Sequence, residues 1–325
     1  MSPRAVIGDA LGPIEGYSLR PHDPGPPGPN QVRIAVKAAG VSFVDVLVSQ
    51  GRYQAKPRVP FIPGSECAGV VEAVGAEVQG VAVGQKVVAT GWCGMFADVV
   101  NAPAGVVWPM PDGLAFEAGA VIAVSYTTAW HALVDRGELK PGETLLVLGA
   151  GGATGLAAVQ LGAHLGARVI ASASSPAKRE AALAGGAHLA IDAGSPTWGD
   201  EVKAATGGQG VDVVFDPVGG EATERAFRRL RWKGRHLVVG FPAGIASLPT
   251  NLPLLKSASL VGVNLSALAQ AEPELAHANH LKVLALAAEG VIRPRIARTY
   301  PLEQYAEAMA EAAKGDSAGR ILLVP

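Results

Sequence analysis

The fold is decided by the stretch from Thr144 to Lys178, TLLVLGAGGATGLAAVQLGAHLGARVIASASSPAK. It opens with a short apolar run, Thr144 to Leu148, of the length typical of a buried parallel strand. A turn of small residues follows, from Gly149 to Gly155, and leads into an amphipathic helical run. A second apolar run, from Arg168 to Ser172, completes a predicted β-α-β unit.

The turn between strand and helix predicts a binding site for a pyrophosphate. It matches the GxGxxG pattern except at the first position, which is alanine. Backbone N–H groups of so small a turn can approach phosphates, whose charge is stabilised at the helix N-terminus. A tight turn without a ligand is the alternative, and the flanking strand and helix weigh against it. The residues expected to contact a dinucleotide are Ala150, Gly152, Ala153, Thr154 and Gly155.

The end of the second strand indicates which dinucleotide binds. NAD-binding folds place Asp or Glu about 20 residues after the glycine turn, where it holds the ribose 2′-hydroxyl. Ala173 stands at that position, so no carboxylate there would repel a 2′-phosphate. Ser174, Lys178 and Arg179 could bind one. Although the two cations could instead be solvated residues of the next helix, the sequence favours NADPH.

Composition suits a globular protein with two domains. The chain has 325 residues, 49% of them hydrophobic and 17% charged, and a net charge of −1. A charge near zero argues against nucleic acid or an anionic membrane as a partner. Two cysteines, Cys67 and Cys93, are expected to be free thiols. Without an apolar signal region or an apolar run long enough to span a bilayer, we expect a cytoplasmic protein.

The N-terminal third and the middle of the chain differ in pattern. In the N-terminal third, short strand-like runs between glycine-containing turns predict a partly closed β-rich barrel. These runs are Gln31–Lys37, Ala68–Val74, Lys86–Ala89 and Phe96–Val100. Further apolar runs extend the β-α-β unit: Leu189–Ile191, Val211–Asp216, Arg235–Val239 and Leu260–Val263. Helices are expected between and after them, including Glu221–Leu230, Glu274–Glu289 and Glu303–Lys314, before a last strand, Arg320–Val324.

These elements predict an α/β protein with two domains. Six strands with helical crossovers form a doubly wound parallel sheet, the Rossmann dinucleotide-binding domain, over 119–264. Residues 1–118, completed by 265–325, form the β-rich domain, because the last strand is expected to rejoin it. Phe241 and Val263 end strands on the cofactor side and are expected neighbours of the nicotinamide.

Ordered motifs along nearly the whole chain carry a family resemblance. They are Ala39–Asp45 (AGVSFVD), Gln50–Tyr53 (QGRY), Phe61–Gly69 (FIPGSECAG), Tyr126–Leu133 (YTTAWHAL), the glycine turn and Asp216–Gly220 (DPVGG). The chain resembles the medium-chain dehydrogenase/reductase superfamily, in its zinc-free, zeta-crystallin-like quinone oxidoreductase branch. The resemblance implies a GroES-like substrate domain around the Rossmann domain, and a homodimer formed through the sheet edge.

Two motif positions predict a metal-free site. Zinc-dependent relatives carry Cys-His where this chain has Ser42-Phe43, and Gly-His-Glu where it has Gly64-Ser65-Glu66. Serine and phenylalanine are not zinc ligands, and two cysteines cannot build the relatives' four-cysteine lobe. His277 and His280, three residues apart on a helix, could bind a metal, although a solvated face is the commoner role. Direct hydride transfer then requires an electrophilic acceptor, such as a quinone or an α,β-unsaturated carbonyl.

The resemblance also implies roles for single residues. Tyr53 stands where enoyl-thioester reductases carry a proton donor, and packing at the rim of the site is its alternative. Ser42 replaces an asparagine that contacts substrate, and Thr128 matches a threonine at the nicotinamide carboxamide. Asp45 and Glu66 are expected to cap and hydrogen-bond buried backbone. Asp192 departs from the pattern, since NADPH-dependent relatives often have tyrosine there beside the 2′-phosphate.

Three functions follow. The first is an NADPH-dependent quinone reductase. The second is an NADPH-dependent reductase of an enone or enoyl thioester, for which Arg52, Lys56 and Arg58 could form a basic entrance for a CoA phosphate. A solvated charge cluster is the commoner role of such residues. The third is a non-catalytic NADPH-binding structural protein, against which the intact glycine turn argues.

Overall fold

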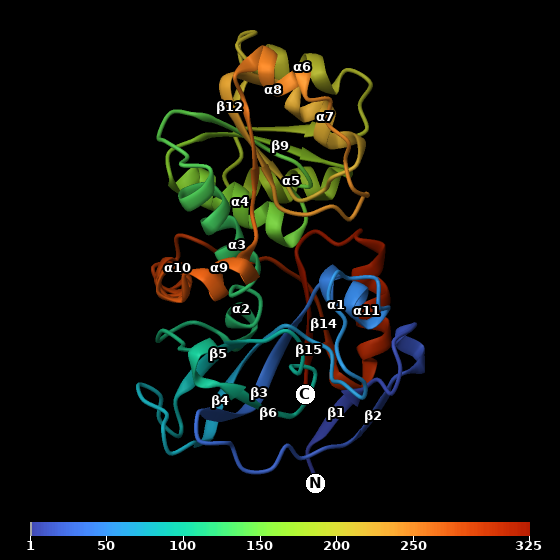
Figure 1. The fold of residues 1–325 in the computed structure, drawn as a ribbon, viewed down its shortest axis with the longest axis vertical. Coiled ribbons are helices and arrows are strands. Elements are labelled where there is room, and N and C mark those ends of the chain that lie inside the picture. The colour runs from blue at the N-terminus through green and yellow to red at the C-terminus, as the bar shows by residue number, and fades with distance from the viewer. Residues whose placement is uncertain (1) are drawn as a thin grey trace. The chain divides into compact units, whose positions relative to one another are not determined.

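The computed structural model describes residues 2–325 and divides into two compact units. Unit 1 comprises Met1–Val124 and His280–Pro325, and unit 2 comprises Ser125–Asn279 (Figure 1). The sequence predicted boundaries at 118/119 and 264/265, and the structure places both of them later in the chain, at 124/125 and 279/280. One reason is that Asn279 donates a hydrogen bond of 2.7 Å to Asp135, which fixes the first half of its helix to unit 2.

Unit 2 is built on a six-stranded sheet in the order β10-β9-β8-β11-β12-β13, and every neighbouring pair is parallel. Its strands are β8 (Thr144–Val147), β9 (Arg168–Ala173), β10 (Leu189–Asp192), β11 (Val211–Asp216), β12 (Leu230–Val238) and β13 (Ser259–Gly262). The order changes direction between β8 and β11, which is the switch point of a doubly wound sheet. The predicted six-stranded Rossmann sheet is therefore confirmed.

Helices flank this sheet, with α4 and α5 on one side of the strands and α6 and α7 on the other (Figure 1). The helices of unit 2 are α3 (Ser125–Trp130), the π-helix η3 (His131–Arg136), α4 (Ala153–His164), α5 (Pro176–Ala184), α6 (Trp198–Ala205), α7 (Glu221–Phe227), α8 (Asn251–Lys256), α9 (Leu265–Ala271) and the part of α10 (Pro273–Ala288) up to Asn279. Helix α7 ends earlier than predicted, because Leu230 is already buried in β12.

Unit 1 contains a seven-stranded sheet in the order β14-β15-β3-β4-β5-β7, with β6 also paired to β3, and a two-stranded sheet, β1-β2. The strands are β1 (Arg4–Ile7), β2 (Ser18–Pro21), β3 (Gln31–Val41), β4 (Glu66–Val74), β5 (Lys86–Thr90), β6 (Val99–Pro103), β7 (Val107–Pro109), β14 (Ile296–Pro301) and β15 (Arg320–Val324). Strand β15 pairs antiparallel with β3, so the C-terminal strand does rejoin the first domain.

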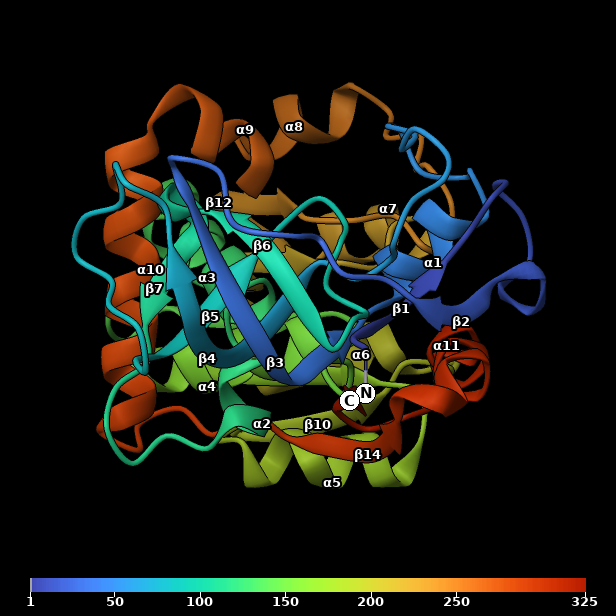
Figure 2. The same ribbon diagram turned by 90° about the horizontal axis from the view of Figure 1, so that it is seen from below.

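The long strand β3 holds unit 1 together. It pairs with β15, β4 and β6, and Figure 2 shows it running between β4 and β6. The helices of this unit are η1 (Ile14–Gly16), α1 (Phe43–Ser49), η2 (Ala104–Val106), α2 (Phe116–Gly119), η4 (Leu302–Gln304) and α11 (Tyr305–Lys314). Predicted strand Phe96–Val100 is displaced to β6, because Phe96 instead packs fully buried in the core.

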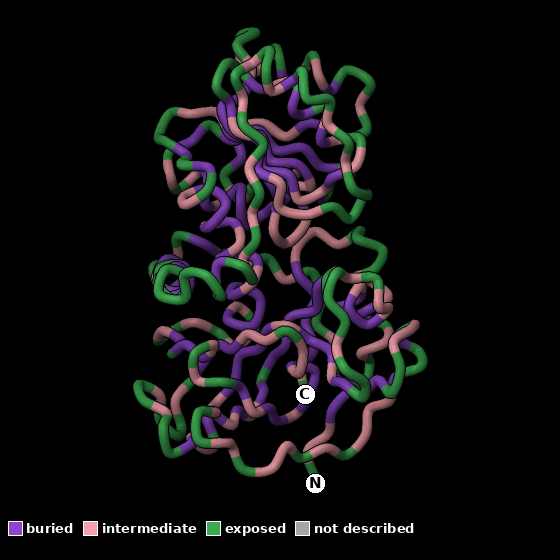
Figure 3. Tube along the Cα trace, in the orientation of Figure 1, coloured by how far each residue is buried: buried purple, intermediate pink, exposed green. Residues whose placement is uncertain are grey.

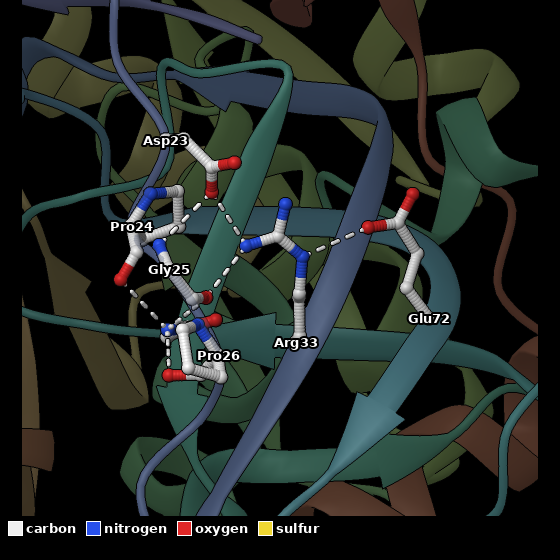
Figure 4. A network of polar contacts seen from close by, with 7 residues as sticks. Asp23, Pro24, Gly25, Pro26, Arg33 and Glu72 are labelled. Atoms are coloured by element: carbon white, nitrogen blue, oxygen red, sulfur yellow. Dashed lines mark hydrogen bonds and ion pairs between the residues drawn. The ribbon is translucent and has the colours of Figure 1, made fainter. Parts of the chain in front are cut away.

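A polar network fixes the proline-rich loop before β3 onto the sheet (Figure 4). The guanidinium of Arg33 donates to Asp23 at 2.7 Å, to the carbonyl of Gly25 at 2.6 Å and to Glu72 of β4 at 3.1 Å. Asn101 of β6 donates to the same carbonyl at 3.2 Å. Since prolines leave the loop few N–H donors of its own, side chains of the sheet hold it in place.

Burial follows the two sheets, whose strands are mostly purple in Figure 3, while connecting loops are largely exposed. Apolar runs of the strands β8, β9 and β11 are fully buried, as Leu146, Ile170 and Phe215 show. This is the pattern expected of parallel strands covered on both faces. Within residues 2–325, no helix is long and apolar enough to cross a membrane.

Candidate functional site

The glycine turn after β8 presents an open helix N-terminus. Gly152 is the N-cap of α4 and offers no side-chain cap, and the first helical bond runs from Leu156 N–H to its carbonyl. The N–H groups of Ala153, Thr154 and Gly155 precede that bond and have no partner within the helix. These donors can bind an anionic group, and the helix dipole favours one there.

Two glycines are required for the shape of this turn. Gly149 has φ +56°, in the left-handed region. A Cβ on Gly155 would lie 2.2 Å from the carbonyl oxygen of Gly149, so only glycine lets α4 pack against the turn. The predicted residues Ala150, Gly152 and Gly155 are thus brought together with the spacing that a pyrophosphate site needs.

Lys178 lies against the same turn. A Cβ on Gly151 would come within 2.3 Å of Lys178 Cβ, so the absence of a side chain at Gly151 makes room for this lysine. Lys178 is a buried residue of the first turn of α5, and its N–H donates to the N-cap hydroxyl of Ser175. Ser174, between β9 and this cap, is exposed. Two of the three predicted contacts of a 2′-phosphate, Ser174 and Lys178, therefore follow directly on the carboxyl end of β9.

Arg179 connects the ends of β9 and β10. Its guanidinium donates to the carbonyl of Ala173 at 3.2 Å and forms an ion pair with Asp192 at 3.0 Å. Asp192 also accepts from the N–H of Gly194 at 2.9 Å. The carboxylate that departs from the family pattern is therefore neutralised by a neighbouring cation.

The remaining predicted cofactor residues also lie in unit 2. Thr128 is half-buried on α3, which packs against α4. Phe241 follows β12 and is 43% exposed. Val263 follows β13, and its N–H donates to the carbonyl of Val238 at 3.0 Å. Because the strands are parallel, the segments after β8, β9, β12 and β13 share the carboxyl edge of the sheet, where such folds bind ligands.

Asp216, at the end of β11, organises the loop that follows at this edge. Its carboxylate accepts from the N–H groups of Val218 and Gly219 at 2.9 Å each, from Thr223 Oγ1 at 2.6 Å and from His236 Nε2 at 2.9 Å. Burial alone would raise the pKa of Asp216, but these hydrogen bonds lower it below its ordinary value. The motif that carried the family resemblance thus has a structural role as a loop anchor.

In unit 1, Tyr53 presents an available hydroxyl. Its ring packs at 5.3 Å from the ring of Trp92, in a tilted arrangement. Within residues 2–325, no hydrogen bond to its hydroxyl is found. Burial raises the pKa of Tyr53, so the phenol stays protonated at neutral pH and can donate a proton. Trp92 was not predicted, although its place among small residues, in Gly91-Trp92-Cys93-Gly94, marks an unusual aromatic.

Ser42 has a well-defined partner in its own helix. It is the N-cap of α1, and its hydroxyl accepts from Asp45 N–H at 3.1 Å and donates to Asp45 Oδ2 at 2.6 Å. That carboxylate also accepts from the N–H of Ser42 at 2.7 Å, which completes a capping box. Burial raises the pKa of Asp45. The predicted capping role of Asp45 is confirmed.

Glu66 holds buried backbone in unit 1. It is fully buried, forms an ion pair with Arg320 of β15, and accepts a 2.9 Å hydrogen bond from the N–H of Val124. Burial raises the pKa of Glu66, and Arg320 counteracts that effect. The predicted structural role of Glu66 is therefore confirmed, with an arginine partner that the sequence did not indicate.

His277 and His280, the pair considered as metal ligands, both lie on α10. His280 stacks on Trp108, with ring centroids 4.0 Å apart. Over the described range, 2–325, no group of three or more His, Cys, Asp or Glu side chains could hold a metal ion. Both cysteines, Cys67 and Cys93, are free.

Comparison with known proteins assigns both parts of the chain. Residues 28–112 match the alcohol dehydrogenase GroES-like domain, and residues 153–279 match the zinc-binding dehydrogenase family. A quinone oxidoreductase-like protein 2 of Rattus norvegicus is 36% identical over 302 residues, which are 92% of this chain and 86% of that protein.

Solved structures agree over the full length. Quinone oxidoreductase of Escherichia coli, in complex with NADPH, superposes with a TM-score of 0.92 at 28% identity, covering 100% of both chains. A probable oxidoreductase of Mycobacterium abscessus superposes with a TM-score of 0.90 at 35% identity, again covering 100% of both chains.

Proposed function

The chain belongs to the quinone oxidoreductase branch of the medium-chain dehydrogenase/reductase superfamily, and on that premise we propose that it reduces a quinone with NADPH, without a metal. The observation that carries the proposal is the uncapped N-terminus of α4, with Lys178 packed against Gly151 of the same turn. This arrangement places Lys178, in the first turn of α5, beside a site that can bind a pyrophosphate.

The residues of unit 2 fit NADPH. The free N–H groups of Ala153, Thr154 and Gly155 would hold the pyrophosphate, and Lys178 with Ser174 would hold the 2′-phosphate. Thr128, Phe241 and Val263 would contact the nicotinamide end. NADPH supplies a hydride when bound, and these residues fix its position. The NADPH complex of the Escherichia coli relative supports this assignment.

The substrate side is proposed to work without a metal ion, because of the residue types present. Ser42 and Phe43 stand where zinc-dependent relatives carry ligands, and neither side chain coordinates zinc. The hydroxyl of Ser42 is already hydrogen-bonded to Asp45 on both its donor and acceptor sides. We therefore assign Ser42 to positioning the start of α1, with a weak polar contact to substrate at most.

Tyr53 is the residue proposed to assist chemistry directly. Its protonated hydroxyl, which bonds to no group among residues 2–325, can hydrogen-bond the oxygen on which charge develops, or donate a proton to it. A quinone requires little such help, because the aromatic hydroquinone anion is already stabilised. An enone or enoyl thioester requires more. The two substrate classes therefore differ in how strongly they depend on Tyr53.

Reduction of an enoyl thioester is the second candidate, and a charge pattern favours it. Arg52, Lys56 and Arg58 are exposed next to Tyr53 in sequence, and none forms an ion pair within residues 2–325. Three such cations could bind the phosphates of CoA. A non-catalytic NADPH-binding protein is the least favoured candidate, since a structural role does not require the free hydroxyl of Tyr53.

We also propose that the protein is a homodimer formed through β13. This strand is the edge of the parallel sheet, and large apolar side chains are exposed on it and near it: Ile245, Leu254, Leu255 and Leu260. An exposed strand edge with apolar neighbours is a template for pairing with a second copy. A cytoplasmic location is proposed because both cysteines are free thiols.

The decisive experiment compares initial rates of NADPH oxidation with an ortho-quinone and with an enoyl-CoA. The variants are Tyr53→Phe and, as a control, Tyr300→Phe, which also removes one phenol hydroxyl. We expect rapid quinone turnover that Tyr53→Phe changes little. Turnover of enoyl-CoA alone, abolished in Tyr53→Phe, would favour the second candidate. NADPH binding without turnover of either acceptor would favour the third, and a preference for NADH would overturn the cofactor assignment.

A further inference from the structure

A group of basic residues lies at the amino ends of the parallel strands, whereas the cofactor turn lies at their carboxyl ends. A pocket of about 220 Å³ opens at the amino ends of β11 and β12, and four segments of the chain line it, which include Lys203, Gly210, Arg229 and Lys256. Gly210 directly precedes β11, and Arg229 directly precedes β12. Helices α6, α7 and α8 lie at the same end of unit 2 in Figure 1.

The lining of this basic pocket is strongly cationic. It includes four basic side chains, Lys203, Arg228, Arg229 and Lys256, and no Asp or Glu. Arg228 is neutralised by Glu224, at 2.5 Å. The other three form no ion pair anywhere in residues 2–325. Three basic side chains without an ion pair therefore line one opening.

Arg229 is held in place without a partner for its charge. A Cβ on Gly199 of α6 would lie 2.4 Å from Arg229 Nη2, so the guanidinium rests against a helix that has no side chain there. Its Nε atom is buried and has no hydrogen-bond partner. An unsatisfied buried donor on a charged group costs free energy that an anion at this position would recover.

The ammonium group of Lys256 is also in an unfavourable environment for a positive charge. Its Nζ donates to the carbonyl of Leu230 at 2.6 Å. Burial lowers the pKa of Lys256, and the nearby charge of Arg229 lowers it further. The fold therefore holds the positive charges of Arg229 and Lys256 close together at the amino end of β12. A bound anion would remove that repulsion.

We propose that the basic pocket binds a small phosphate-bearing anion through Lys203, Arg229 and Lys256. Its volume lies below the range of pockets for drug-sized ligands, which begins at roughly 300 Å³, so a single phosphate group suits it. Neighbouring amides do not take part, since Gly208 and Gly210 N–H already bond to Lys203 carbonyl and Thr206 Oγ1. Recognition is by side-chain charge, which explains the cluster of three cations.

The test is calorimetric titration of inorganic phosphate into the full chain in chloride buffer, with and without saturating NADPH. The variants are Arg229→Gln and Lys203→Gln. Lys233→Gln is the matched control, because Lys233 is an exposed lysine of β12 outside the pocket. We expect phosphate to bind with NADPH present, about tenfold or more weakly in Arg229→Gln, several-fold more weakly in Lys203→Gln, and unchanged in Lys233→Gln.

Two results would overturn the proposal. Phosphate binding that disappears when NADPH saturates the protein would place the anion at the cofactor turn. Equal affinities for phosphate in all variants would show that phosphate associates with the protein nonspecifically and not at the basic pocket. If Arg229→Gln does not fold, Lys203→Gln decides, since its side chain is exposed. The titration contains no electron acceptor, and the phosphate affinities of the variants can also be compared without NADPH. The result therefore does not depend on whether the proposed quinone reduction takes place.

Discussion

The guanidinium of Arg179 lies 3.0 Å from the carboxylate of Asp192, at the carboxyl ends of two neighbouring parallel strands. The same guanidinium reaches the carbonyl of Ala173, at the position where NAD-binding folds carry an acidic residue. One cation is thus shared between a carboxylate and the end of β9. This pairing sets how much positive charge is available for a 2′-phosphate.

Asp192→Asn is expected to strengthen the preference for NADPH over NADH. The substitution frees Arg179 and removes a negative charge, while the amide oxygen can still accept from Gly194. Because the pair is partly exposed, we expect roughly a two- to fivefold increase in the ratio of kcat/KM values. Asp200→Asn, at an exposed position of α6, is the control. An unchanged ratio in Asp192→Asn would mean that Arg179 does not reach the 2′-phosphate.

Gly155→Ala is expected to disrupt the cofactor turn. Its Cβ would stand 2.2 Å from the carbonyl oxygen of Gly149, so α4 must move away from β8. Overpacking of this kind costs about 1–3 kcal/mol, and we expect NADPH to bind at least tenfold more weakly. Fluorescence titration measures the affinity. Gly105→Ala, where no atom lies within 4 Å of the new Cβ, should behave as the parent protein does.

Leu260→Lys is expected to convert the proposed dimer to a monomer. Leu260 is 49% exposed on β13, and a charged residue on an edge strand opposes pairing with another strand. Light scattering coupled to gel filtration measures the mass. Leu183→Lys is the control, because Leu183 is exposed to a similar degree, 48%, on α5. Dimers that persist in Leu260→Lys would place the interface elsewhere.

Asp216→Asn is expected to lower stability and to reduce its dependence on acid pH. Hydrogen bonds to the carboxylate hold the pKa of Asp216 below its unfolded value of about 3.9, so its stabilisation is present above that pH and is lost as pH falls toward the folded pKa. Removing the charge should cost about 2–4 kcal/mol at neutral pH.

Urea unfolding from about pH 5 down to about pH 3 measures this difference. The parent protein should lose more stability over that interval than Asp216→Asn does, because only the parent loses the contribution of an ionised Asp216. Equal losses would mean that the carboxylate has an ordinary pKa in the folded protein. Asp200→Asn, which lacks such hydrogen bonds, is again the control.

Much of unit 2 could be predicted from sequence because its central strands, β8, β9 and β11, are buried on both faces. Such strands contain continuous apolar runs, as Leu145–Val147 and Val213–Phe215 do, and the small residues between strand and helix mark the turn. Strand β14 was missed for the opposite reason. Most of its residues, in IARTYP, are exposed, so the run has no apolar pattern to detect.

Partners distant in sequence were the least predictable part of the candidate site. Arg179 meets Asp192 only through the register of β9 against β10, and Glu66 meets Arg320 only because β15 returns to β3. The Ser42–Asp45 capping box, in contrast, is local. Its signature, serine followed three residues later by a carboxylate, stands in the sequence itself, so the capping role of Asp45 could be predicted.

The place of β15 in the sheet also determines the order in which the chain can fold during synthesis. Strand β15 lies between β14 and β3, whereas Ser125–Asn279 is continuous in sequence. The ribosome therefore releases all of unit 2 before it has made the strand that covers the edge of β3. Although domains usually fold in the order of their N-termini, here the second unit can be complete first. Until Arg320–Val324 emerges, the exposed edge of β3 is open to pairing with other nascent chains.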